Sequence, residues 1–103
     1  MPITYGKSGN GKKGSDMDEV LRILRKIKDE RTHCQCSRAK IVEKIYFERL
    51  EKALSALPFD SDKESILNYL SAEKGSVRIT NDDLRIRAQT FDYAMAVVNR
   101  VFG

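Results

Sequence analysis

Apolar residues recur with helical spacing along most of the chain, and most densely in residues 41–57 (IVEKIYFERLEKALSAL). At about 100° per residue, they cover roughly twice the arc that one face of a surface helix shows. The apolar residues form adjoining rows: Ile41, Val42, Ile45, Tyr46, Phe47, Leu50, Ala53, Leu54 and Leu57. We therefore predict a central helix that packs against neighbours on two sides and is covered by the other helices.

Three further stretches follow the helical period and carry start or stop signals. The first stripe is Met17, Val20, Leu24 and Ile27, and a short second one is Ile66 and Leu70. In the last stripe, apolar residues recur at alternating spacings of 4 and 3 residues: Leu84, Ala88, Phe91, Met95, Val98 and Phe102. We predict helices over about 16–31, 37–57, 62–74 and 81–102, and an all-α fold, a small three- to four-helix bundle.

The connections between these stretches are less regular. Residues 32–37 (THCQCS) interrupt the apolar rhythm and predict a turn, but without Gly or Pro one continuous helix over 16–57 is the alternative. Residues 76–80 (SVRIT) alternate like a strand. Since a lone strand forms no sheet, we expect an extended connection with Val77 and Ile79 tucked onto the bundle.

Turn and capping residues predict the helix ends. Ser15 or Asp16 suits the first start, and Ser37 suits the second. Pro58 ends the central helix, and Ser61 with Glu64 forms a capping box before the third helix. We expect Gly75 to end the third helix and Thr80 to cap the fourth.

Residues 1–15 (MPITYGKSGNGKKGS) have four glycines, three lysines and no acid. A segment so poor in apolar residues cannot offset the entropy of ordering, so we predict a flexible basic tail before one helical domain over 16–103. Residues 6–13 resemble a phosphate-binding P-loop, but Lys13 stands where Ser or Thr would hold magnesium, and no buried strand precedes them. We therefore predict no cofactor and a solvated linker.

Composition narrows the class of protein. The 103 residues suffice for one domain, and no apolar run is long enough for a membrane span or a signal peptide. We therefore expect a cytoplasmic protein with no membrane partner. With one histidine and no distinctive carboxylate pair, the sequence favours a non-enzymatic protein without a small-molecule substrate.

Metal binding is an alternative at the turn. His33, Cys34 and Cys36 are suitable zinc ligands, but a structural zinc site needs four, and the chain has no other His or Cys. The simpler interpretation is that Cys34 continues the apolar stripe while the other two side chains face water.

A second apolar strip on residues 81–102 is the candidate partner-binding surface. It consists of Ile86, Tyr93 and Val97, on the far side of the helix from the main stripe. Such a face would bind a helix of another protein or a second copy of the chain. The alternative is a closed bundle in which the first and third helices cover it. The favoured function is thus that of a small regulatory or adaptor protein, with a homodimer as one form.

Nucleic-acid binding is the alternative function. It would use basic residues of the tail and the first helix: Lys7, Lys12, Lys13, Arg22, Arg25 and Lys26. The net charge of +4 allows this, but acids are interleaved with the bases of the helix, as in the pair Asp18 and Arg22.

Residues 66–88 (ILNYLSAEKGSVRITNDDLRIRA) resemble the C-terminal part of the flagellar anti-sigma factors. The shared plan is a helix, a glycine, a short stretch alternating apolar and basic residues, a cap and a second helix. It maps to Gly75, Val77, Arg78, Ile79, Thr80 and Leu84. The resemblance implies capture of a sigma factor by these two helices. The chain departs from the family in its two strongly patterned N-terminal helices and in Arg85, where a small residue is usual.

Overall fold

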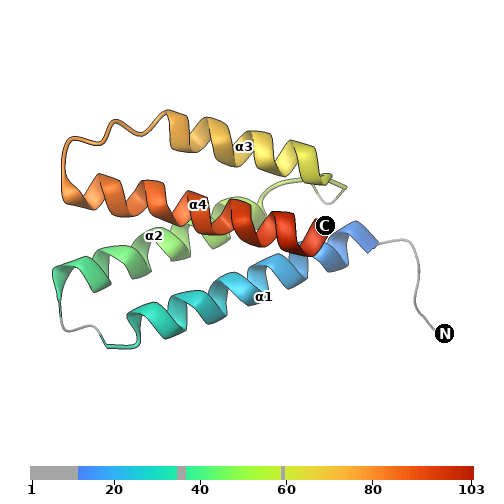
Figure 1. Cartoon of the computed structure of the whole chain (residues 1–103). Helices are drawn as coiled ribbons and strands as arrows, with labels where there is room; N and C mark the ends of the chain where they lie inside the picture. Colours follow the sequence, from blue (N-terminus) through green and yellow to red (C-terminus); the bar gives the residue numbers. More distant parts are fainter. Residues whose placement is uncertain (1–11, 35–36, 59) are drawn as a thin grey trace.

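The computed structural model describes residues 12–34, 37–58 and 60–103. These ranges contain four helices: α1 (Lys12–Thr32), α2 (Arg38–Ser55), α3 (Lys63–Gly75) and α4 (Asp82–Phe102). All regular structure in them is helical, and the prediction of an all-α helical bundle is confirmed (Figure 1). The described helices include none that is long and apolar enough to span a bilayer.

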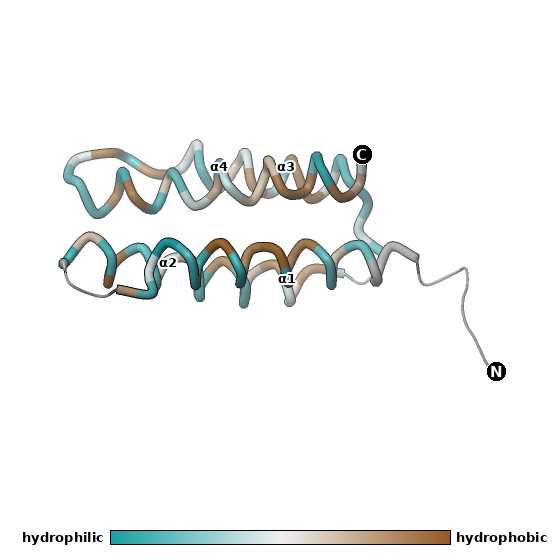
Figure 2. The backbone as a smooth tube through the Cα atoms, turned by 60° about the horizontal axis from the view of Figure 1, so that its bottom comes forward, coloured by the Kyte–Doolittle hydropathy of each residue, from teal (hydrophilic) through white to brown (hydrophobic). Residues whose placement is uncertain are grey.

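The helices form two layers, one made of α1 and α2 and the other of α3 and α4 (Figure 2). The last helix, α4, contacts each of the other three, whereas α2 contacts α1 and α4, and α3 contacts α4. The prediction that residues 41–57 form the central helix is therefore wrong, because α4 holds that position. Two neighbours of α2 are present as predicted, but they leave part of its wide apolar arc uncovered.

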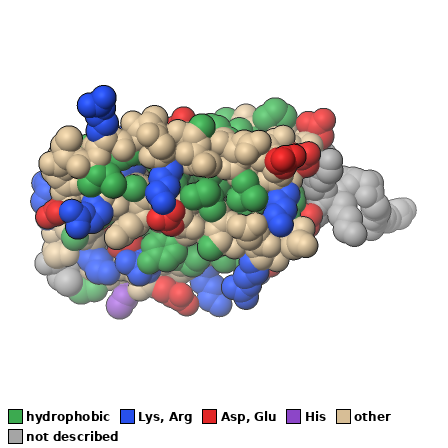
Figure 3. All heavy atoms as spheres, turned by 45° about the horizontal axis from the view of Figure 1, so that its top comes forward, with side chains coloured by type: hydrophobic (Ala, Val, Ile, Leu, Met, Phe, Trp, Pro, Cys, Tyr) green, Lys and Arg blue, Asp and Glu red, His purple; other side chains and the backbone are tan. Residues whose placement is uncertain are grey.

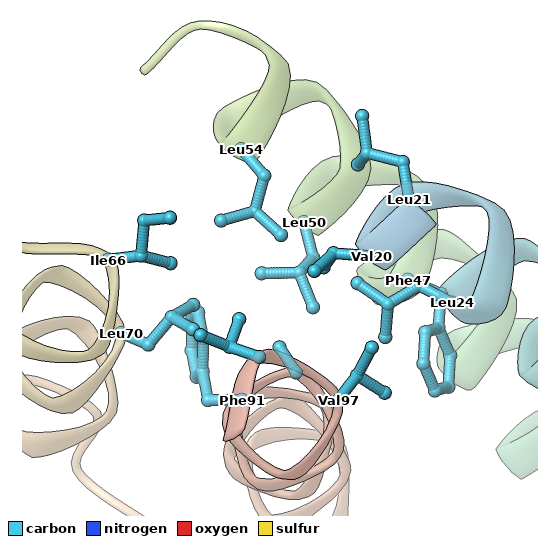
Figure 4. Packing of buried hydrophobic residues seen from close by; sticks show 12 residues of the cluster. Val20, Leu21, Leu24, Phe47, Leu50, Leu54, Ile66, Leu70, Phe91 and Val97 are labelled. Carbon is cyan, nitrogen blue, oxygen red and sulfur yellow. The ribbon is translucent and has the colours of Figure 1, made fainter. Parts of the chain in front are cut away.

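Side chains from all four helices meet in one core (Figure 4). The periodic residues Val20, Leu24, Ile66, Leu70 and Val98 are buried there, as their spacing indicates. From α2 come Phe47, Leu50 and Leu54. The helical period in the sequence therefore identifies most of the core.

Helix ends differ from the prediction by small shifts. Helix α1 begins at Lys12, so Ser15 and Asp16 lie inside it, and residues 1–11 of the predicted tail lie outside the described residues. Asp62 caps α3 by accepting from the Ser65 amide at 2.8 Å, and Asn81 caps α4 by accepting from the Leu84 amide at 3.0 Å. The predicted caps Ser61 and Thr80 each lie one residue earlier; Asp and Asn cap at least as well as Ser and Thr.

Three connections can be compared with their predictions. Ser37 caps α2 as expected, and α1 and α2 are separate helices in contact, so the continuous-helix alternative is wrong. Gly75 is the last residue of α3 but does not take a left-handed backbone, and Ser76 follows it as the C-cap. In the extended connection, Val77 packs against the core, whereas Ile79 is 54% exposed rather than tucked in.

We expect Leu70→Ala to lower the free energy of unfolding by about 2–5 kcal/mol, since Leu70 is fully buried and its loss leaves a cavity. The matched control Ile79→Ala should change it by less than about 0.5 kcal/mol, since that side chain is largely in water. Urea unfolding followed by circular dichroism measures both. Equal effects of the two substitutions would contradict the packing of α3 on α4.

Candidate functional site

Ion pairs join α1 to one side of α2. Arg25 lies 2.7 Å and Lys28 3.1 Å from carboxylate oxygens of Glu51, and Lys28 also lies 3.9 Å from Glu48. Arg31 donates to Glu43 at 2.5 Å. All three carboxylates of α2 therefore lie within ion-pair distance of bases of α1, although about half of the Glu48 side chain stays exposed.

Glu43, the partner of Arg31, is the most buried carboxylate of these contacts. Glu43 is 6% exposed, and the Arg31 guanidinium also lies over the ring of Tyr93, 4.9 Å from its centroid. The hydrogen bond to Glu43 raises the pKa of Arg31, which stabilises its charged form. Tyr93 in turn packs on Phe47, with ring centroids 5.8 Å apart. This cluster fixes the ends of α1 and α2 against the middle of α4.

The predicted partner-binding strip on α4 lies largely within these contacts. Val97 is 5% exposed and belongs to the core, so its placement on a free surface is wrong. Tyr93 is held between Arg31 and Phe47, and Ile86 is partly buried. The physical reason is the central position of α4, which needs apolar residues on several sides to pack against three helices.

The structure also shows where most basic residues of the alternative nucleic-acid surface lie. Arg22 pairs with Glu19 at 2.6 Å, Arg25 pairs with Glu51, and exposed Lys26 lines a groove that also holds Asp16 and Glu30. On the face in Figure 3, basic and acidic side chains are interspersed. Lys7 lies outside the described residues, and Lys12 and Lys13 belong to the first turn of α1.

The possible zinc ligands lie at the turn after α1. His33 and Cys34 are exposed, and Cys36 lies outside the described residues. In the part of the chain that the structure describes, no three His, Cys, Asp or Glu side chains are grouped to hold a metal ion.

The exposed apolar surface lies instead on the outer side of α2. Ile41 is 44% and Ile45 43% exposed, one helical turn apart. They line an open groove of about 650 Å³. Its walls consist of Ser37, Arg38, Ile41, Val42, Ile45, Tyr46, Arg49 and Asp83. We name this surface the α2 groove.

The α2 groove continues along the helix. A second hollow of about 530 Å³ shares Ile45 and Arg49 with it and reaches Ser55. Together they follow α2 over its 18 residues, which is about 27 Å at 1.5 Å per residue. At the other end, Arg38 pairs with Asp83 of α4 at 2.5 Å.

Three carboxylates line the two hollows, Asp83, Glu48 and Glu51, and each lies within ion-pair distance of a base, whereas the charges without such a partner are positive. Arg49 lies over the ring of Tyr46, 5.7 Å from its centroid. Within the described ranges, neither Arg49 nor Lys52 has a carboxylate partner. The groove therefore combines an apolar floor with cations that are available to a ligand.

Sequence reasoning missed this surface although it contained a signal. Ile41 lies about 160° around the helix from Glu43, at 100° per residue, and Ile45 lies equally far on the other side. Two neighbours cannot cover both that row and the row of Phe47, Leu50 and Leu54 on the opposite side. The width of the arc was therefore a sign of an exposed face.

Residues 66–88, the stretch that the sequence analysis compares with the anti-sigma factors, cover most of α3, the connection and the first part of α4. Its residues Ile66, Leu70 and Ala88 are buried, and Ile79 is its large exposed apolar side chain. No protein family model, curated protein or solved structure matches the chain.

We expect Glu43→Gln to lower the free energy of unfolding by about 1–3 kcal/mol, because it weakens a buried charge-assisted hydrogen bond to Arg31. Glu48→Gln is the matched control, since Glu48 is an exposed acid of the same helix, and should cost less than about 0.5 kcal/mol. Chemical denaturation at neutral pH compares them. A Glu43→Gln effect no larger than that of the control would contradict the role of this pair.

We expect Tyr93→Ala to cost about 3 kcal/mol of stability, because it removes the ring that packs on Phe47 and beneath Arg31. Tyr93→Phe keeps the ring and should stay within about 1 kcal/mol of the parent protein. Thermal unfolding distinguishes the two roles of this residue. Unchanged stability of the Tyr93→Ala protein would contradict this packing role and would make Tyr93 a candidate partner-binding residue again.

Proposed function

We propose that this chain is a non-enzymatic protein-binding module of the regulatory or adaptor kind, which binds a helix of its partner in the α2 groove. The observation that carries this proposal is the exposure of Ile41 and Ile45 side by side in a groove. Both side chains lie outside the core that the four helices form together. Large apolar side chains grouped on a surface are typical of binding sites.

The electrostatics of the described residues favour binding over catalysis. Shifted pKa values occur where hydrogen bonds join surface charges, as in the raised pKa of Arg38 beside Asp83 and the lowered pKa of Glu19 beside Arg22. Burial raises the pKa of Tyr69. These are positions of ion pairing and packing, whereas a catalytic centre gathers perturbed groups in one cleft.

Protein binding also has more support than nucleic-acid binding. Arg22 and Arg25 form ion pairs with Glu19 and Glu51, so their charge is partly neutralised. A nucleic-acid surface depends on bases grouped without acids between them. The α2 groove, by contrast, has an apolar floor, which a phosphate backbone would not contact favourably.

The test compares Ile41→Gln/Ile45→Gln with Ile79→Gln, which changes an exposed isoleucine outside the groove. Removing the two groove side chains should weaken partner binding roughly 10- to 30-fold, since their burial contributes about 2 kcal/mol together. The thermal stability of both variants should stay close to that of the parent, because all three side chains lie outside the core and are each about half exposed.

Quantitative affinity capture from cell extract, followed by titration of the purified partner, measures the effect. The proposal requires a partner that binds the parent and Ile79→Gln proteins but loses affinity for the double variant. Equal binding by all three proteins would contradict it.

A further inference from the structure

We infer that the occupant of the α2 groove is an acidic amphipathic helix: one with apolar residues spaced three and four apart and with carboxylates beside them. This inference rests on the proposed function and specifies the partner by its chemistry. Three observations carry it: the cations beside the groove that have no carboxylate partner among the described residues, the form of the groove, and the effect of pairing α2 with its own copy.

The charged residues of α2 differ in whether an opposite charge lies within ion-pair distance. Its three carboxylates, Glu43, Glu48 and Glu51, lie within ion-pair distance of bases of α1. Arg49 and Lys52, beside the exposed isoleucines, have no carboxylate partner in the part of the chain that the structure describes. The groove therefore attracts a negative ligand, and charge complementarity of this kind governs both specificity and the rate of association.

The form of the groove favours a helix as the ligand. The backbone groups of α2 are occupied by its own hydrogen bonds, so an extended peptide would gain none of the main-chain bonds that stabilise an added strand. The exposed side chains Ile41 and Ile45 are one turn apart, which matches the ridge of a second helix. A partner helix of up to about five turns fits the length of α2.

Pairing with a second copy supplies no acidic partner for Arg49 and Lys52 when the two α2 helices meet at Ile45. In an antiparallel pair centred there, Arg49 of each copy would lie opposite Ile41 of the other, and Lys52 would lie opposite Arg38, which Asp83 already pairs. In a parallel pair, Arg49 and Lys52 would each meet their own counterparts. Like charges placed opposite one another oppose association, whereas an acidic helix would neutralise the same cations.

The experiment selects binders from a displayed library of helical peptides. The apolar stripe varies among Leu, Ile, Val, Met and Phe, and each flanking position holds Glu, Gln or Lys in equal proportion. Selection on the full chain should enrich Glu at the flanks. From the best binder, three peptides with Glu, Gln or Lys flanks are then titrated by fluorescence anisotropy.

The Glu peptide should bind roughly fivefold more tightly than the Gln peptide, and the Lys peptide more weakly than either. The differences in affinity among the three peptides should become smaller in the Arg49→Gln/Lys52→Gln variant. They should also become smaller at about 0.5 M salt, which screens the charges. All three peptides should lose affinity for Ile41→Gln/Ile45→Gln. Circular dichroism melts of both double variants verify that they are folded.

Two contrary outcomes separate this inference from the proposed function. Peptides that depend on Ile41 and Ile45 but bind regardless of their flanking charge would overturn the acidic partner and leave the groove as the binding site. Selected peptides that bind the Ile41→Gln/Ile45→Gln protein as well as the parent would overturn both. A further contrary outcome would come from light scattering. If the parent protein is a dimer and the Ile41→Gln/Ile45→Gln variant is a monomer, the occupant is a second copy of the chain, and the acidic partner is overturned.

Discussion

The packing of α4 against three helices is the constraint on which the rest of the structure depends. A helix with neighbours on several sides must be apolar over most of its circumference, and α4 supplies Ala88, Phe91, Ala94, Val97 and Val98 to buried positions. Because α4 takes the central position, α2 becomes a peripheral helix with two neighbours. The outermost apolar row of α2 then has nothing within the described fold to cover it, and the α2 groove follows from that arrangement.

The ion pairs between α1 and α2 give this groove its charge. Bases of α1 pair with the carboxylates of α2, and the partly buried pair of Arg31 and Glu43 stabilises the same contact where it meets Tyr93. Arg49 and Lys52, which lie near the two isoleucines, have no carboxylate partner among the described residues. One set of contacts thus stabilises the hairpin and also pairs the carboxylates of α2, which leaves these two cations available to a ligand.

The sequence was sufficient to predict the helices and most of the core residues, because burial of Val20, Leu24, Ile66 and Leu70 follows directly from helical spacing. It was not sufficient to predict which helix is central or where the candidate site lies. Residues 41–57 and 81–102 both show wide apolar arcs, and periodicity measures the width of an arc without telling which neighbours cover it. The caps show the same limit on a smaller scale: where Ser61 precedes Asp62 and Thr80 precedes Asn81, either residue of each pair has suitable chemistry, and the packing of the chain decides.

The limited backbone packing of α3 has a consequence for the dynamics of the fold. Helix α3 is the shortest of the four described helices, with 13 residues, and its backbone contacts are confined to one neighbour (Figure 1). A segment with few close backbone neighbours opens locally at a lower free energy than one enclosed on several sides. The backbone amides of α3 should therefore exchange with solvent through its own partial opening, while those of α4 exchange only when the whole bundle unfolds.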